Sequence, residues 1–210
     1  MQHRKPELFE SDLPPERLAH YLKKQFIAVD TETRGLNIPR DRLCLVQLCD
    51  NEGVVSFVRY RDGSEFERAN NLKKLLESED VLKVIHFARF DYAVMKHYLG
   101  ADTRPLFCTK IASKLVRTYT DRHSLKDLSR ELLVMEMDKS DQMSDWARDD
   151  LSDSQLEYAA NDVRVLIPIY EKMVALLARE GRTEIAQRCF QALPVVCDLD
   201  LKGFRDIFEH

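Results

Sequence analysis

The sequence lacks the features that mark membrane and secreted proteins. No window approaches the roughly 18 apolar residues of a membrane-spanning helix, and the N-terminus has no apolar segment typical of a secretory signal. We therefore expect a cytoplasmic protein with no membrane partner. The five cysteines are odd in number and form no CxxC pair, so neither a disulfide framework nor a zinc site is indicated. We expect them to be reduced residues of the core.

An excess of basic residues is also missing. The formal net charge of the 210 residues is −4, which argues against a protein that coats long nucleic acid by bulk electrostatics. The charge is uneven, however, because residues 110–130 contain six Lys or Arg and two Asp, whereas residues 131–162 contain ten Asp or Glu and two Lys or Arg. A basic segment beside an acidic one fits an anionic substrate next to a metal site, and equally two solvated helix faces.

The apolar pattern that is present is typical of an α/β domain. Three strands are predicted at 24–31, 43–50 and 53–60, and turn residues join them into an antiparallel meander. Further strands at 81–88 and 106–109 alternate with helices. Helices are predicted at 65–78, 89–100, 110–118, 124–134 and 152 to about 192, with a kink or break at Pro168. We expect one domain over 1–210, with an N-terminal arm at 1–20 and a C-terminal helical extension from about 180.

Two carboxylates stand at the end of the first predicted strand. Asp30 and Glu32 follow the apolar run 26–29, and alternation along a strand places both side chains on one face. Two like charges at that distance repel each other, and burial strengthens the repulsion. A divalent cation between them relieves it, and oxygen ligands favour Mg²⁺ or Mn²⁺ over zinc. Such a pair alone is more often solvated, but the apolar run before it favours a metal site.

Further acidic residues occupy the ends or faces of predicted helices. Asp91 lies in the first turn of the helix after strand 81–88, where a carboxylate can also simply stabilise the helix dipole. Tyr158 and Asp162 are four residues apart and project from one helix face. Four carboxylates and a tyrosine indicate a two-metal site for phosphoryl transfer. The tyrosine hydroxyl is suited to orienting the attacking water.

These residues form three ordered motifs, DTE at 30–32, HFARFD at 86–91 and YAAND at 158–162. Together they resemble the tyrosine-bearing branch of the DEDD superfamily of 3′-5′ exonucleases, and residues 144–163 resemble ribonuclease D. The segments DRLCLVQL and CTKIASKLVRTYTDRH more closely resemble nano-RNase C, a sub-family of short bacterial enzymes. The resemblance implies a ribonuclease H-like fold with a mixed central sheet flanked by helices.

The same resemblance implies an activity and roles for the motif residues. It implies hydrolysis of very short single-stranded RNA, notably dinucleotides, with two Mg²⁺ or Mn²⁺ ions, in a homo-oligomer that is an octamer. Asp30, Glu32 and Asp162 would hold the ion that activates water. Asp30 would bridge to the second ion, on which Asp91 would act through water. Tyr158 would position the attacking water.

Other residues are candidates for substrate binding, each with a plainer alternative. Leu36 follows the DTETRG turn and either wedges between bases, as in related short-RNA nucleases, or is an ordinary turn residue. His86 either contacts the substrate or simply ends a strand. The basic segment offers side chains that could bind phosphate. The remaining candidates are Thr31, Arg117, Arg122, His123 and Lys126. The single tryptophan, Trp146, is expected in the core and not stacked on a base.

Three functions remain open at this point. The first is hydrolysis of dinucleotides and other very short oligomers. The second is the same chemistry on longer strands, either ribonuclease D-like 3′ trimming of RNA or digestion of DNA, and the dependence of rate on length separates the two. The third is a catalytically silent nucleic-acid-binding module, against which the complete set of motif residues argues.

Overall fold

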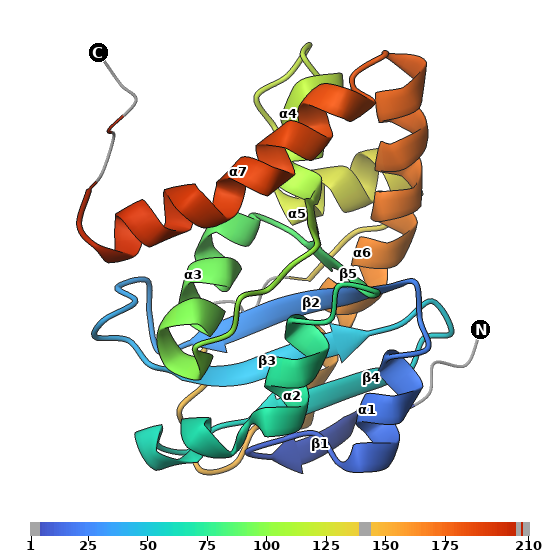
Figure 1. Cartoon of the computed structure of the whole chain (residues 1–210). Coiled ribbons are helices and arrows are strands. Elements are labelled where there is room, and N and C mark those ends of the chain that lie inside the picture. The colour runs from blue at the N-terminus through green and yellow to red at the C-terminus, as the bar shows by residue number, and fades with distance from the viewer. Residues whose placement is uncertain (1–4, 139–143, 205–206, 208–210) are drawn as a thin grey trace.

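The computed structural model describes residues 5–138, 144–204 and 207. Its centre is a six-stranded mixed sheet with the strand order β1-β4-β3-β2-β5-β6 (Figure 1). The strands are β1 (Glu7–Glu10), β2 (Phe26–Thr33), β3 (Leu43–Cys49), β4 (Val55–Arg59), β5 (Leu82–Ile85) and β6 (Leu106–Cys108). The helices are α1 (Pro15–Tyr21), α2 (Asn70–Leu76), α3 (Ala88–Leu99), α4 (Thr109–Val116), α5 (Leu125–Leu128), α6 (Asp153–Arg179) and α7 (Thr183–Leu201). Two short turns are η1 (Gly63–Arg68), a 3-10 helix, and η2 (Ser129–Leu133), a π-helix.

The predicted meander is confirmed. β2 pairs antiparallel with β3, and β3 pairs antiparallel with β4, so that Val29 lies opposite Leu48 and Val46 opposite Val58. β5 and β6 extend the sheet in parallel beside β2. Every residue of β3 and β4 is buried, as expected for strands covered on both faces.

The segment expected to be an N-terminal arm contains regular structure that the sequence pattern did not indicate. β1 pairs in parallel with β4 and forms one edge of the sheet, and α1 packs beside α2. β1 is only four residues long and mostly exposed. It therefore carries little of the apolar alternation by which a strand is recognised in a sequence.

Helices cover both faces of the sheet. Figure 1 shows α1, α2 and α3 on the near face and α6 running behind it. α6 contacts β2, β3, β4 and β5, and it begins at the predicted capping box, in which Ser152 and Gln155 exchange side-chain and backbone hydrogen bonds. Of the predicted kink or break at Pro168, the break is wrong, because α6 continues through the proline to Arg179. Buried positions on both sides of the proline hold the helix against its neighbours despite the missing backbone donor.

The tryptophan and four of the five cysteines lie in the core, as predicted. Trp146 is only 3% exposed and belongs to the main hydrophobic cluster. All five cysteines are free, and four of them are buried. Within the described residues, no helix is long and apolar enough to cross a bilayer.

Lys83 is a charged residue in the middle of this core. It is fully buried in β5, and its ammonium group donates to the carbonyl oxygens of Ser78 at 2.7 Å and Arg104 at 2.6 Å. Burial lowers the pKa of Lys83 to about 7, because two neutral acceptors do not replace the lost hydration of the charge.

We predict that Lys83 makes the stability of the fold depend on pH. Its pKa is lower in the folded chain than the ordinary value of 10.5. Between these two values the unfolded chain binds more protons, so the free energy of unfolding rises with pH in that window. Lys83→Met should reduce this slope by up to about 1.4 kcal/mol per pH unit. Urea unfolding across the window measures the slope. The exposed Lys23→Met is the control, and equal slopes in wild type and Lys83→Met would contradict the prediction.

Candidate active site

Three carboxylates from distant parts of the chain meet behind the sheet. Asp30 and Glu32 project from one face of β2, and Asp162 comes from the third turn of α6, which packs along that face. One oxygen of each lies within 4.8 Å of the others. Gln47, opposite Asp30 on β3, donates to Glu32 Oε1 at 3.4 Å. The packing of α6 on β2 therefore creates the cluster that the motifs predicted.

Asp91 approaches the same cluster from α3. It is buried in the first turn of that helix, and its Oδ1 accepts a hydrogen bond of 2.7 Å from the hydroxyl of Thr31. Thr31 lies between Asp30 and Glu32 on β2 and points to the other face. Its hydroxyl thus holds Asp91 in place, a contact that differs from the substrate contact predicted for it. Asp91 lies outside the group of three ligands within 4.8 Å, yet its charge is the largest electrostatic influence on Asp30.

Burial and mutual repulsion disturb the acidity of the whole cluster. Burial, followed by the charges of Asp91, Asp162 and Glu32, raises the pKa of Asp30 well above its ordinary value. Burial and the charges of Asp162 and Asp91 do the same to the pKa of Glu32. Burial raises the pKa of Asp91 to about 7. A divalent cation would supply the missing counter-charge, and an all-oxygen donor set fits Mg²⁺ or Mn²⁺.

Tyr158 stands one helical turn before Asp162 and hydrogen-bonds to its carboxylate. Burial, followed by the charges of Asp162 and Glu32, raises the pKa of Tyr158 above its ordinary range, so the phenol keeps its proton at neutral pH. The ring of Trp146 packs beside it, with the centroids 6.1 Å apart. Trp146 therefore supports Tyr158 from within the core.

The predicted wedge residue is presented by a tight loop. Leu36 is 86% exposed and follows Gly35, whose carbonyl accepts a 2.6 Å hydrogen bond from the Thr33 hydroxyl. A Cβ atom at Gly35 would lie 2.5 Å from Asp41 Oδ2, the oxygen that accepts the backbone N–H of Asn37. The loop thus requires glycine there, and it holds Leu36 out into solvent, as an inserting side chain requires.

The two histidines predicted to bind substrate each lie within hydrogen-bond distance of a side-chain hydroxyl group. His86 directly follows β5 and is half-buried, with Nδ1 2.9 Å from Thr109 Oγ1. His123 Nδ1 lies 2.8 Å from Ser113 Oγ, and burial, followed by the charge of Arg117, lowers the pKa of His123. Both imidazoles are therefore oriented by the protein itself.

The basic segment, residues 110–130, contains both buried and solvent-accessible basic side chains. Arg117 is only 2% exposed. Its guanidinium forms two hydrogen bonds with the carboxylate of Glu131 and one of 3.0 Å with Ser113 Oγ. Arg117 thus ties α4 to η2 and does not present its charge to solvent, contrary to what a phosphate-binding role requires. Arg122 is exposed and Lys126 is half-buried, so these two stay available as phosphate contacts.

Sequence reasoning assigned no role to two residues, Gln47 on β3 and Phe87 within the HFARFD motif. Gln47 is a buried amide on β3 whose contact with Glu32 depends on strand register. Phe87, the N-cap residue immediately before α3, lies in the left-handed backbone region, with φ 58° and ψ 44°. No sequence signal marks an aromatic residue for that conformation, whereas glycine or asparagine there would have indicated it.

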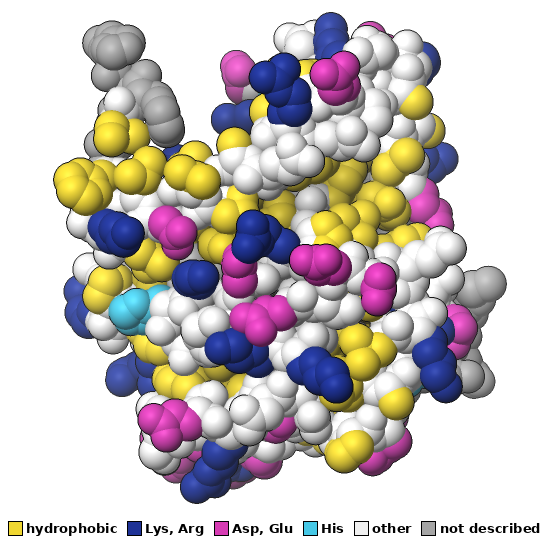
Figure 2. All heavy atoms as spheres, viewed as in Figure 1, with side chains coloured by type: hydrophobic (Ala, Val, Ile, Leu, Met, Phe, Trp, Pro, Cys, Tyr) yellow, Lys and Arg dark blue, Asp and Glu magenta, His cyan; other side chains and the backbone are white. Residues whose placement is uncertain are grey.

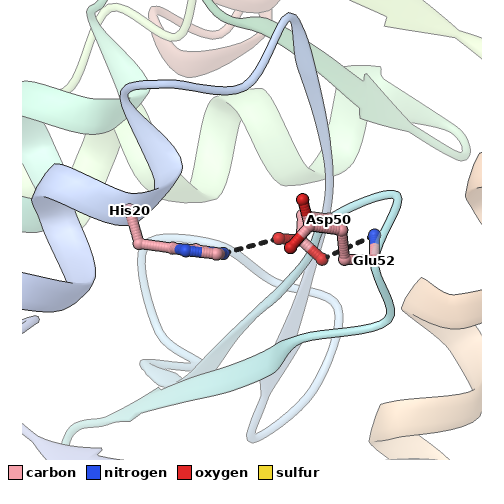
Figure 3. Close-up of side chains that lie close together, drawn as sticks. All are labelled: His20, Asp50 and Glu52. Atoms are coloured by element: carbon pink, nitrogen blue, oxygen red, sulfur yellow. Dashed lines mark hydrogen bonds and ion pairs between the residues drawn. The ribbon is translucent and has the colours of Figure 1, made fainter.

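A second group of possible metal ligands lies at the other end of β2, where His20, Asp50 and Glu52 meet (Figure 3). His20 Nε2 is 2.6 Å from Asp50 Oδ2. Lys24 Nζ lies 3.3 Å from that same oxygen and 2.5 Å from Glu52 Oε1. The lysine already supplies a cation to both carboxylates, so this group is a salt-bridge cluster and not a second metal site.

A large cavity also lies away from the carboxylates. It measures about 990 Å³ between α6, α7 and β6, with Phe107, Tyr170 and Phe190 on its wall. Figure 2 shows the apolar side chains gathered in this hollow. None of the predicted site residues lines this cavity, so cavity volume alone does not identify the candidate active site.

The chain is similar to a known protein family. Residues 8–178 match the family model described as a 3′-5′ exonuclease. The chain belongs to this 3′-5′ exonuclease family. Within it, the chain is 32% identical over 177 residues to ribonuclease D of Sphingobium indicum, which covers 84% of this chain and 45% of the relative. The chain thus spans less than half the length of that curated relative.

Solved structures of the family agree along nearly the whole chain. The Brucella melitensis NrnC structure superimposes with a TM-score of 0.92 and 45% identity, covering 99% of this chain and 100% of that one. The same protein has been solved with bound Mg²⁺ and bound to pGG, at TM-scores of 0.91 and 0.89 and 43% identity. The coverage of both chains is 98% or more in each comparison. The predicted ribonuclease H-like exonuclease fold is therefore confirmed.

We predict that Mn²⁺ stabilises the folded chain, because it relieves the repulsion among Asp30, Glu32 and Asp162. At about 100 times the dissociation constant, binding adds about 2.7 kcal/mol to the free energy of unfolding. Calorimetry with and without Mn²⁺ measures the rise in Tm, and Asp162→Asn should lose most of it. Glu52→Gln is the matched control and should keep it. The reverse pattern would place the ion at the His20 cluster.

Proposed function

We propose that the chain is a divalent-metal-dependent 3′-5′ exoribonuclease that hydrolyses very short oligonucleotides, notably dinucleotides, to nucleoside 5′-monophosphates. The observation that carries the proposal is the convergence of Asp30, Glu32 and Asp162 within 4.8 Å, with Asp91 and Tyr158 against them. Acids that the fold brings together at such electrostatic cost are expected where a site uses the charge.

The carboxylates divide between two ions in this proposal. Asp30, Glu32 and Asp162 would hold one, which accords with their mutual distances. Asp30 would also contact the second ion, on which Asp91 would act through water, in keeping with the position of Asp91 outside the group of three. When bound, such ions lower the pKa of water and offset the charge of the phosphodiester.

Tyr158 supplies the orientation of the attacking water. In this proposal its hydroxyl acts as a hydrogen-bond partner of the water. It directs the water oxygen at the terminal phosphorus. The new P–O bond forms as the P–O3′ bond breaks, the freed 3′ oxygen takes up a proton, and the terminal nucleotide leaves as a 5′-monophosphate.

Two features support a short substrate. The similar Brucella protein, 43% identical along 98% of this chain, has been solved with pGG. The net charge of −4 suits a ligand with few phosphates better than a long strand. From the resemblance of the sequence to nano-RNase C, we also propose a single exonuclease domain over 1–210. It would act in the cytoplasm as a homo-oligomer, an octamer.

A length series tests the proposal directly. RNA of two, three, five, seven and twenty nucleotides, labelled at the 5′ end, is incubated with enzyme and Mg²⁺ or Mn²⁺, and initial rates are compared with a parallel DNA series. The proposal requires the dinucleotide to be cleaved fastest. Rates that hold or rise with length would support the second candidate, 3′ trimming, which the similarity to ribonuclease D favours. No cleavage of any substrate would support a silent binding module.

We predict that Tyr158→Phe lowers kcat by about 10²–10⁴-fold, because the water loses its orienting hydroxyl while the three carboxylates stay in place. The Mn²⁺-dependent rise in Tm should persist in this variant. Asp30→Asn is the contrasting variant and should abolish both turnover and most of that rise. An equal loss of metal stabilisation in Tyr158→Phe would show that the tyrosine acts through the metal site instead.

A further inference from the structure

One polar side chain interrupts an otherwise apolar strand beside the carboxylates. The other six residues of β3 are leucine, valine or cysteine, and the whole strand is buried. Gln47 is 0% exposed and faces Asp30 across the β2–β3 pair. Residues that face each other in a sheet share one side of it, so its amide lies on the side that carries Asp30 and Glu32. An apolar residue would fill this position without a polar group to satisfy.

The amide of Gln47 is only half satisfied. Its Nε2 lies 3.4 Å from Glu32 Oε1, whereas its own Oε1 is buried and has no hydrogen-bond partner in the part of the chain that the structure describes. A buried acceptor without a partner destabilises a folded protein. The fold therefore keeps a glutamine here against its own stability, which points to a use for the one contact that the amide makes.

Glu32 is the metal-ligand candidate that most needs such a contact. It has one more rotatable side-chain bond than Asp30 or Asp162, and so more conformers to lose when it is ordered. The register of the β2–β3 pair shifts directly after Glu32, so the backbone holds it less firmly than Asp30. Within the described residues, Gln47 is the only hydrogen-bond donor to the Glu32 carboxylate.

The neutrality of this donor matters as much as its position. In the other acidic cluster, Lys24 Nζ lies 3.3 Å from Asp50 Oδ2 and 2.5 Å from Glu52 Oε1, and thus supplies the cation itself. A neutral amide orients a carboxylate without supplying a counter-charge. At 3.4 Å the contact is also longer than the roughly 2.9–3.0 Å typical of such bonds, so it leaves most of the ligand capacity of Glu32 to an ion.

We infer that Gln47 is a positioning residue of the metal site, which orients Glu32 toward a divalent cation and lowers the stability of the metal-free fold. Residues that hydrogen-bond to a metal ligand fix its orientation and thereby raise metal affinity. The amide does this without competing with the ion for the negative charge. The inference rests on the proposed function, because it assumes a divalent cation at Asp30, Glu32 and Asp162.

Replacement of Gln47 should separate metal affinity from stability. Gln47→Met keeps the length of the side chain and removes both the donor and the unpaired acceptor. We expect it to weaken Mn²⁺ binding about 10-fold and to leave the Tm of the metal-free protein unchanged or higher. Calorimetric titration with Mn²⁺ measures the affinity, and thermal unfolding in EDTA measures the Tm. In activity assays, a higher Mn²⁺ concentration should restore most of kcat.

A control variant separates positioning from general damage to the core. Ser56 on β4 is buried and accepts a 2.9 Å hydrogen bond from the Tyr21 hydroxyl, and strand register places it on the opposite side of the sheet from Gln47. Ser56→Ala should lower the Tm and leave the affinity for Mn²⁺ unchanged.

Three results would overturn the inference. They are an unchanged Mn²⁺ affinity in Gln47→Met, a fall in both the affinity and the metal-free Tm of that variant, and a wild-type protein that binds no Mn²⁺. A wild-type protein that binds Mn²⁺ in a Gln47-dependent way but cleaves no oligonucleotide would refute the proposed function and leave the inference in place.

Discussion

Repulsion among closely spaced carboxylates is the constraint on which the rest of the structure depends. Asp30, Glu32 and Asp162 lie within 4.8 Å of one another, with Asp91 close behind them, and each would be more stable apart and hydrated. The sheet opposes this repulsion. β2 is flanked by β3 and β5 and covered on both faces, so the strand cannot yield locally. The energy gained from packing the core thus holds the acids together until a cation completes the site.

The supporting contacts show how few polar groups maintain this arrangement. Gln47 donates to Glu32 across the sheet, Thr31 donates to Asp91 from the other face of the strand, and Tyr158 bonds to Asp162 along α6. None of these donors carries a charge. These three contacts therefore do not offset the negative charge of the cluster, whereas Lys24 offsets that of Asp50 and Glu52 from within the chain.

Basic residues, by contrast, are used more for architecture than a sequence suggests. Arg117 belongs to the most basic stretch of the chain, yet its guanidinium is buried against Glu131. The ammonium group of Lys83 donates hydrogen bonds to two backbone carbonyl oxygens inside the protein. Lys110, at the start of α4, places its ammonium group 3.9 Å from the ring centroid of Phe87. A count of lysines and arginines therefore gives little indication of where an anionic ligand meets the protein.

The sequence by itself determined the strands of the meander, the capped start of α6 and the identity of the clustered acids. Each depends on local signals, namely alternation, a capping box and carboxylates after an apolar run. Tertiary structure alone decided the rest. The partners of Thr31, Arg117 and Gln47 arise from register and helix packing between segments far apart in the chain. α6 continues through Pro168 because buried contacts on both sides outweigh one missing hydrogen bond. Phe87 takes a left-handed conformation at the junction of β5 and α3, and no local preference of phenylalanine could have indicated that.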